Sequence, residues 1–170
     1  MRCSSLVSVM RFICGISVTT ICSRISAEIS SGKCVPYYMS IKGDNVNARV
    51  GPGGNYKVRY IYMVRGLPVI VVAKYDTWYK VIDPDREECW IHKSMLSSRR
   101  CVIVTNTTGT RIHERSNDSS AVIAYAKKSV VMELVRIRGN WCEVNVTHAG
   151  NRVHGWVNRA TVFGITDSEG

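Results

Sequence analysis

The sequence has little of several features that define whole classes of protein. Only 4 of its 170 residues are proline, and its 13 glycines follow no regular period, which excludes a collagen-like chain. It has no heptad pattern of apolar residues, so a coiled coil is excluded. Low-complexity tracts are also lacking, and 45% of the residues are hydrophobic, which excludes disorder as the main state. The length suits one medium domain or two small ones.

Long apolar runs are missing as well. The run Phe12–Cys22 has 11 residues, about half of the ~20 that a membrane-spanning helix needs. Arg2 and Arg11 stand before and at the start of this run, and the small residues Ser26-Ala27 follow it. This is the pattern of a secretory signal peptide. The sequence therefore predicts a signal segment over residues 1–27 and an exported mature protein.

Acidic residues are scarce. The chain has 13 Asp and Glu against 23 Lys and Arg, a formal charge of +10, and without residues 1–27 the balance is 20 basic against 13 acidic residues, or +7. The basic residues are spread out, in runs no longer than Arg99-Arg100 and Lys127-Lys128. Surfaces that bind nucleic acid usually cluster their basic residues. No nucleic-acid partner is expected, although an anion or nucleic-acid binder stays open as a further alternative.

A helical period is absent after residue 33. The chain instead shows short runs rich in Val, Ile, Tyr and Trp, separated by turn signals, which is typical of strands. These runs are Val46–Arg49, Val58–Val64, Pro68–Lys74, Trp78–Ile82, Cys89–His92 and Cys101–Thr105. Gly51–Asn55 is predicted as a loop whose glycines accept positive φ, and Asp83–Asp85 as a turn. The pattern predicts an all-β protein.

Tryptophan is rare, and its placement reveals a repeat. The equivalent segments are Val46–Arg49 and Ile112–Arg115, Trp78 and Trp141, and Trp90 and Trp156, at spacings of 66, 63 and 66 residues. Because the matches keep their order and account for all 4 tryptophans, they predict two modules of ~60–65 residues. Five or six short strands in each module favour a small, partly open β-barrel.

The first module resembles the bacterial SH3-like domains. Val46–Gly53 (VNARVGPG) follows the N-x-R-x-G-P-G opening of that family, and Asp76–Val81 (DTWYKV) and Trp90–Leu96 (WIHKSML) continue it in order. The chain is most similar to the exported tandem SH3-like proteins of alphaproteobacteria. The resemblance implies an all-β fold of two tandem SH3-like β-barrels after the signal segment. It also implies a short 3₁₀ turn at Met95-Leu96, with Arg100–Thr105 as the last strand of the module.

The predicted organisation follows from the repeat and the resemblance. Its parts are a signal peptide at 1–27, an N-terminal lead-in at 28–41, a first module at 42–105, a linker at 106–110, a divergent second module at 111–165 and a tail at 166–170. The second module has Ser116–Ser120 in place of the glycine-rich loop, so the function of one loop does not transfer to the other.

The resemblance implies a non-catalytic module that binds or scaffolds in the bacterial cell envelope, in the periplasm or secreted. Its expected partner is peptidoglycan or an envelope peptide or protein, and the alternative is a secreted protein that binds a host or partner protein. Aromatic side chains offer broad contact area to such ligands. In the SH3 manner, the groove of the first module is predicted to use Tyr56, Tyr60, Trp78, Tyr79 and Trp90. The competing interpretation is that Trp78 and Trp90 only pack the barrel.

The remaining residues predict no enzyme and no cofactor. A catalytic domain that accompanies SH3-like modules needs ~100 further residues, and the two modules leave none. Cys142, His148 and His154 are spaced more widely than zinc ligands usually are, so no metal is expected. Cys89 and Cys101 flank the predicted 3₁₀ turn, and we predict that they form a disulfide. Reduced structural thiols are the alternative.

Overall fold

The structure is a computed structural model that describes residues 34–148 and 150–166. The predicted signal peptide, residues 28–33 of the predicted lead-in and all of the tail but residue 166 lie outside these ranges. No helix within them is long and apolar enough to cross a membrane. Short strands and tight connections make up this part of the chain, as the sequence predicts.

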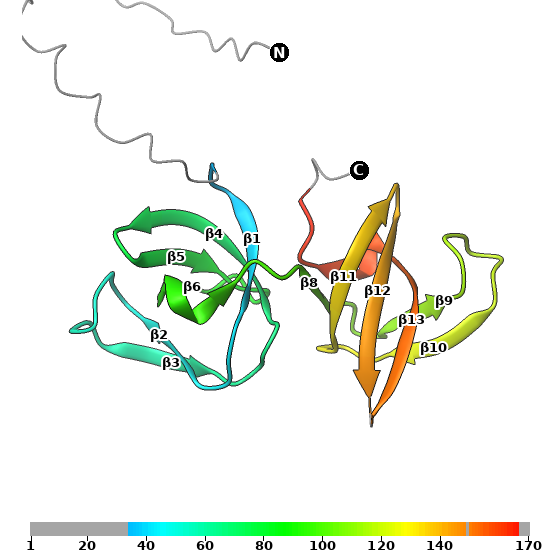
Figure 1. The fold of residues 1–170 in the computed structure, drawn as a ribbon, viewed down its shortest axis with the longest axis horizontal. Coiled ribbons are helices and arrows are strands. Elements are labelled where there is room, and N and C mark those ends of the chain that lie inside the picture. Colours follow the sequence, from blue (N-terminus) through cyan, green and yellow to red (C-terminus); the bar gives the residue numbers. More distant parts are fainter. Residues whose placement is uncertain (1–33, 149, 167–170) are drawn as a thin grey trace, which may run out of the picture. The chain divides into compact units, whose positions relative to one another are not determined.

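The first barrel is one antiparallel sheet of seven strands in the order β3-β2-β6-β5-β4-β1-β7 (Figure 1). Its strands are β1 (Tyr37–Ile41), β2 (Val46–Arg49), β3 (Val58–Tyr62), β4 (Pro68–Tyr75), β5 (Trp78–Ile82), β6 (Glu88–His92) and β7 (Leu96–Ser97). A 3₁₀ turn, η1 (Lys93–Met95), joins β6 to β7. The turn predicted around Met95 is thus present.

The second barrel repeats this topology in the order β10-β9-β13-β12-β11-β8-β14. Its strands are β8 (Cys101–Val104), β9 (Thr110–His113), β10 (Val122–Ala126), β11 (Val131–Arg138), β12 (Trp141–His148), β13 (Asn151–Asn158) and β14 (Val162–Phe163). The turn η2 (Arg159–Thr161) joins β13 to β14. The prediction of two tandem barrels is therefore confirmed.

Alternation along the strands gives each barrel its own core. Val71 and Val81 are fully buried in the first barrel, as are Val102 and Val144 in the second. These side chains point to the inner face of their sheets, because successive residues of a strand point to opposite faces. The buried residues form two separate clusters, one in each barrel. Each repeat thus encloses its own hydrophobic interior.

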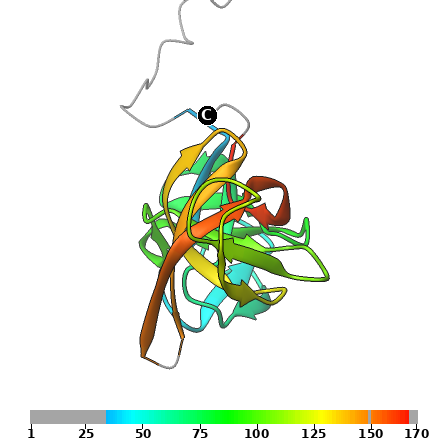
Figure 2. The ribbon, with the colours of Figure 1, turned by 90° about the vertical axis from the view of Figure 1, so that its right-hand side faces the viewer.

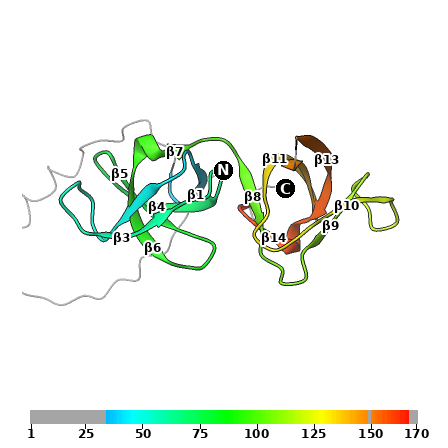
Figure 3. The same ribbon diagram turned by 90° about the horizontal axis from the view of Figure 1, so that it is seen from below.

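The hairpins differ in length between the two barrels. β12 and β13 form a long hairpin, orange in Figure 2, with eight paired positions from Trp141 and Asn158 to His148 and Asn151. The equivalent pair in the first barrel, β5 and β6, has five. The loop between β9 and β10 extends away from the rest of the second barrel (Figures 1 and 3). It carries one wall of the site described below.

Strand pairing divides the chain differently from the predicted modules at both ends of the first barrel. β1, in the predicted lead-in, pairs with β4 and with β7 and so belongs to the first sheet. β8, predicted as the last strand of the first module, pairs instead with β11 and β14 of the second sheet. β9 begins at Thr110, inside the predicted linker. An apolar run indicates a strand, but only the pairing partner of that strand shows to which sheet the strand belongs.

Candidate binding faces

Both tryptophans of the first barrel lie on the outer face of its sheet. Val81 on β5 and Ile91 on β6 point into the core and are fully buried. Trp78 and Trp90 stand at odd spacings from these residues, so they project from the opposite face. The register pairs Trp78 with His92 and Lys80 with Trp90, which places all four side chains on that face.

Trp78 is held by two basic side chains, one from the neighbouring strand β6 and one from β2. The imidazole of His92 packs against it edge to face, with 5.3 Å between the ring centroids. The guanidinium carbon of Arg49 lies 6.0 Å from the indole centroid, a distance at which a cation is attracted to the aromatic ring. Trp78, Arg49 and His92, together with Lys80 and Trp90, are called the Trp78 face below.

Arg49 also fixes the loop at residues 50–57. Its Nη1 donates to the backbone oxygen of Tyr56 at 2.7 Å. The ring of Tyr56 lies directly against Gly51, where a Cβ atom would overlap it, and a Cβ at Gly53 would approach it to 3.2 Å. Neither glycine has positive φ, so the predicted reason for them is wrong. The loop needs glycine because the Tyr56 ring packs on its backbone.

Trp90 borders a second, charged part of the Trp78 face. It lines a hollow of about 270 Å³ together with Val50, Arg59, Lys80, Glu88 and Cys89. Lys80 and Glu88 form an ion pair across β5 and β6 at 2.5 Å, and Arg59 reaches Glu87 at 3.4 Å. These exposed pairs contribute little to stability, but they leave Lys80 and Arg59 at the rim of the hollow.

The second barrel has an equivalent face around Trp141. Register makes Trp141 the counterpart of Trp78, because Trp141 pairs with Asn158 as Trp78 pairs with His92. His92 and Asn158 also share a role, since each side chain accepts a backbone N–H at the start of its 3₁₀ turn. The Trp141 face consists of Trp141, Asn158, His113, Glu143 and Trp156.

The structure corrects the alignment of the opening strands. Arg49 pairs with Trp90 and His113 pairs with Trp156, so Arg49 corresponds to His113 and not to Arg115. The spacing between these equivalent residues is therefore 64 and not 66. His113 packs edge to face against Trp141 at 5.2 Å. An imidazole thus stands where the first barrel has a guanidinium.

Trp156 is covered by charged residues in an order opposite to that around Trp90. Glu143 corresponds to Lys80 and His154 to Glu88, by their pairings in β12 and β13. The Glu143 carboxylate is buried and pairs with His154 Nε2 at 2.9 Å and with Arg136. Arg136 lies over the Trp156 ring at 5.3 Å. Trp156 is therefore buried and not open to a ligand.

The five aromatic residues predicted to form a groove do not lie together. Trp78 and Trp90 are on the outer face, and Tyr56 is on the loop beside it. Tyr60 and Tyr79 point inward and pack against the core of the first barrel. The Tyr60 hydroxyl lies 3.1 Å from that of Tyr62, and burial raises the pKa of Tyr60.

The residues that sequence reasoning missed are Arg49, His92, His113 and Trp141. The period-2 alternation of β5 was the signal that could have found them. It separates Trp78 and Lys80 on one face from Tyr79 and Val81 on the other. The same alternation in β12 places Trp141 and Glu143 outward.

The predicted disulfide between Cys89 and Cys101 is wrong. Cys34, Cys89, Cys101 and Cys142 are all free thiols in the described part of the chain. Cys89 lies in the core of the first barrel, whereas Cys101 begins the first strand of the second sheet. Burial raises the pKa of both thiols and raises that of Cys142 to about 11. The alternative of reduced structural cysteines is what the structure shows.

The spaced Cys142 and His154 do not converge either. Cys142 is fully buried in the second core, while His154 is exposed and pairs with Glu143 on the outer face. Residues 34–148 and 150–166 contain no group of three or more His, Cys, Asp and Glu side chains placed to hold a metal ion.

These two barrels, each with a tryptophan-centred outer face, define a tandem all-β protein by fold. The family model of the bacterial SH3 domain matches the chain twice, over residues 42–98 and 111–164. The chain belongs to the bacterial SH3 domain family. Domains of this family are typically binding modules and are in general non-catalytic.

Other comparisons add less. No curated protein matches the chain. Among solved structures, it is similar to NlpC2 and NlpC1 from Trichomonas vaginalis, with 14% and 15% sequence identity and TM-scores of 0.33 and 0.32. Each match covers 78% of this chain, and 49% and 47% of those chains respectively. The chain thus spans about half the length of these two structures.

Proposed function

We propose that this protein is an exported, non-enzymatic binding or scaffolding module of the bacterial cell envelope, and that it binds peptidoglycan or an envelope peptide or protein. One observation carries the proposal: both barrels place a half-buried tryptophan, Trp78 or Trp141, at the same register on the outer face. A residue that served only to pack the core would point inward. Each indole instead packs against a histidine ring on the outer face.

Charge supports an envelope partner. Without the predicted signal segment the chain carries a formal +7, and Arg49 adds positive charge to the Trp78 face, where Lys80 is paired with Glu88. A cationic surface attracts anionic polymers over long range, and the aromatic surface then supplies short-range contact. Export rests on the pattern of residues 1–27. N-terminal sequencing of the protein recovered from the periplasm or the culture medium tests it, and an intact Met1 there would contradict it.

Co-sedimentation with purified peptidoglycan across a salt series tests the binding function. Binding through the tryptophan faces should persist at 0.5 M salt, where the screening length is only ~4 Å, whereas purely electrostatic binding should disappear by ~0.2 M. Trp78→Ala and Trp141→Ala should each reduce retention. Tyr75→Ala is the matched control, since Tyr75 is exposed and lies beside Trp78 at the hairpin turn. Equal retention of all variants would contradict the proposal.

A protein partner is the second candidate, and the two edge strands favour it. β3 and β10 are the terminal strands of their sheets. Large apolar side chains are exposed on or beside them, namely Ile61, Met63, Val64, Val122, Ile123 and Tyr125. An edge strand presents unpaired backbone groups to which an extended peptide can add. Affinity capture from envelope extracts should lose the partner with Ile61→Lys and Ile123→Lys if this candidate is correct.

A further inference from the structure

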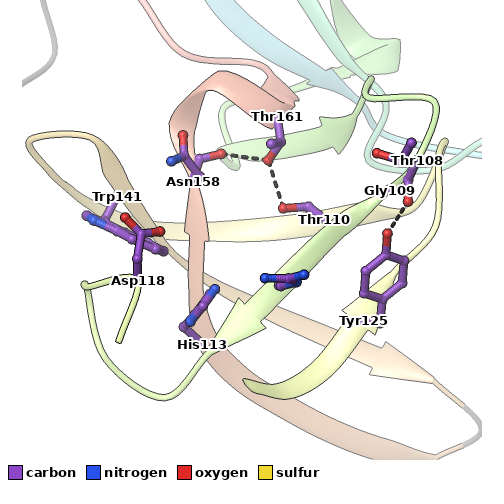
Figure 4. Close-up of a pocket in the computed structure, with 10 residues that line it drawn as sticks. Thr108, Gly109, Thr110, His113, Asp118, Tyr125, Trp141, Asn158 and Thr161 are labelled. Atoms are coloured by element: carbon purple, nitrogen blue, oxygen red, sulfur yellow. Dashed lines mark hydrogen bonds between the residues drawn. The ribbon is translucent and has the colours of Figure 1, made fainter. Parts of the chain in front are cut away.

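The second barrel has a polar hollow that extends beyond the Trp141 face. It has a volume of about 460 Å³, within the range of small-molecule sites. All ten residues that line it come from the second barrel. Six of them carry the argument: Arg111, His113, Asp118, Tyr125, Trp141 and Asn158. Trp141 and Tyr125 stand at opposite ends of the hollow (Figure 4).

The walls of this hollow are held by hydrogen bonds before any ligand arrives. On one side, the loop after His113 is closed by Glu114 N–H to Ala121 O at 2.9 Å and by Arg115 N–H to Ser120 Oγ at 2.9 Å. This loop carries Asp118. A site whose walls are already ordered loses less conformational entropy on binding.

The other side is fixed from η2 and β10. Thr161 Oγ1 lies 2.8 Å from Thr110 Oγ1 and 2.7 Å from Asn158 O. The Tyr125 hydroxyl donates to Thr108 O. Gly109, next to Thr108, has φ of +80°, and a Cβ there would collide with the Ala126 oxygen. The close approach of these strands therefore requires glycine.

His113 is fixed in the wall of the hollow. Its Nδ1 lies 3.2 Å from the backbone oxygen of Ser120. A carbonyl oxygen only accepts, so Nδ1 donates this hydrogen bond. His113 is buried, at 6% exposure, which holds the ring against Trp141.

Arg111 and Asp118 give the hollow two opposite charges. Both side chains are exposed and line the same hollow. Neither forms an ion pair with another residue in the described ranges, and they do not pair with each other. The indole of Trp141 adds an electron-rich surface that attracts an ammonium group. The hollow thus offers a carboxylate and an aromatic ring to a cation, and a guanidinium to an anion.

We propose that this hollow binds a short peptide that carries both a free ammonium and a free carboxylate. The ammonium lies against Asp118 and Trp141, and the carboxylate pairs with Arg111. Guanidinium and carboxylate form strong charge-assisted hydrogen bonds. This assignment rests on the proposed binding function and adds the ligand class for the second barrel.

The first barrel does not share this specificity. Asn47 stands two residues before Arg49, as Arg111 stands two residues before His113, so the carboxylate-binding cation is missing from the equivalent position. Its indole is already approached by Arg49, which repels an ammonium. The two barrels therefore differ in the ligands that they select.

Titration of the full ¹⁵N-labelled chain with four triglycine derivatives tests this assignment. The peptides are free triglycine, its N-acetyl form, its C-terminal amide and the form blocked at both ends. Free triglycine should bind roughly tenfold more tightly than either singly blocked form, because each block removes one charged contact of about 1.4 kcal/mol. Its binding should shift the Trp141 indole N–H signal, assigned with Trp141→Phe, and leave that of Trp78 unchanged.

Two variants make the test specific. Asp118→Asn should lose most of the preference for free over N-acetyl triglycine and keep only the part that Trp141 supplies, and Arg111→Gln should bind free triglycine and its amide equally. Arg115→Gln, on the same loop, is the control and should behave as the parent chain does. Equal binding of all four peptides by the parent chain, no binding at all, or an ammonium preference that Asp118→Asn does not reduce would each overturn the assignment. None of these results would contradict the proposed binding function, because the sedimentation assay tests that function separately through Trp78.

Discussion

The imidazole of His113 packs edge to face on the indole of Trp141, with ring centroids 5.2 Å apart. The first barrel makes the same kind of contact between His92 and Trp78 at 5.3 Å, but the two histidines come from non-equivalent strands. His113 ends β9, whereas His92 ends β6. The fold thus fixes where each tryptophan stands, and the sequence of each barrel decides which side chain reaches it. This difference allows one fold to present two different surfaces.

Reversal of the ion pair in the first barrel is the first prediction. Lys80→Glu places a like charge beside Glu88 and should lower the free energy of unfolding by about 0.5–1 kcal/mol. Adding Glu88→Lys should restore most of that loss, because the second barrel already has the reversed order in Glu143 and His154. Urea unfolding followed through resonances of the first barrel measures both changes. Strictly additive losses would show that the two side chains do not interact.

Gly51 and Gly54 should respond very differently to alanine. A Cβ at Gly51 overlaps the Tyr56 ring, while one at Gly54 meets nothing within 4 Å. Gly51→Ala should therefore cost about 1–3 kcal/mol through displaced packing, and Gly54→Ala should be close to neutral. Thermal unfolding compares the two. If Gly51→Ala is as stable as Gly54→Ala, the loop does not depend on this contact.

Tyr62 should be important for the stability of the first barrel. Its hydroxyl donates to Asp83 Oδ2 at 3.0 Å, and the other oxygen of Asp83 accepts from the N–H groups of Asp85 and Glu87. Tyr62→Phe removes one partner of a buried carboxylate and should cost about 1–3 kcal/mol. Tyr75→Phe, at an exposed ring, should cost nothing measurable.

The same residue gives a pH dependence. Burial raises the pKa of Tyr62 above its ordinary value of 10.0, so the folded state keeps this phenol neutral. The contribution of this neutral phenol to the free energy of unfolding is complete below pH 10. It is lost as the pH rises further, because the Tyr62 phenol of the unfolded chain then releases its proton first. Stability should fall above pH 10 in the parent chain and fall less steeply in Tyr62→Phe. Parallel curves would contradict this account of the Tyr62 environment.

Thiol reactivity should separate the cysteines of the described chain. Cys34 is exposed, whereas Cys89, Cys101 and Cys142 are buried. With its pKa at about 11, Cys142 has only about one thiolate in a thousand at pH 8. Brief alkylation of the native protein, mapped by mass spectrometry, should label Cys34 and leave the three buried thiols for labelling in denaturant. A peptide that joins Cys89 to Cys101 would contradict the free thiols.

The sequence predicted the fold better than it predicted the faces. Tryptophan spacing predicted two copies of one barrel, because a half-buried residue at a fixed register recurs whenever its strand recurs. The sheet to which β8 belongs could not be predicted, because Cys101–Val104 is equally apolar whichever sheet it joins. Tyr60 and Tyr79 were placed on the ligand side because they are aromatic, although their alternation with Ile61 and Trp78 turns them inward.

The hollow of the second barrel could not be predicted at all. Asp118 and Arg111 reach it from a loop and from an adjacent strand, and only the three-dimensional path of Ser116–Ser120 brings the loop there. Nothing in the spacing of these residues distinguishes them from other surface charges. The repeat places opposite charges, Lys80 and Glu143, at equivalent positions. Which side chains these charges contact depends on strand pairing, which for Glu143 is the pairing of β12 with β13.

The most direct test of the account is retention on peptidoglycan at 0.5 M salt by the parent chain and by the double variant Trp78→Ala/Trp141→Ala. Circular dichroism should first show that the variant keeps its β structure. We predict that the parent chain sediments with the polymer and that the folded double variant stays in solution. Retention of the folded double variant at the level of the parent chain would contradict binding through the two tryptophan faces.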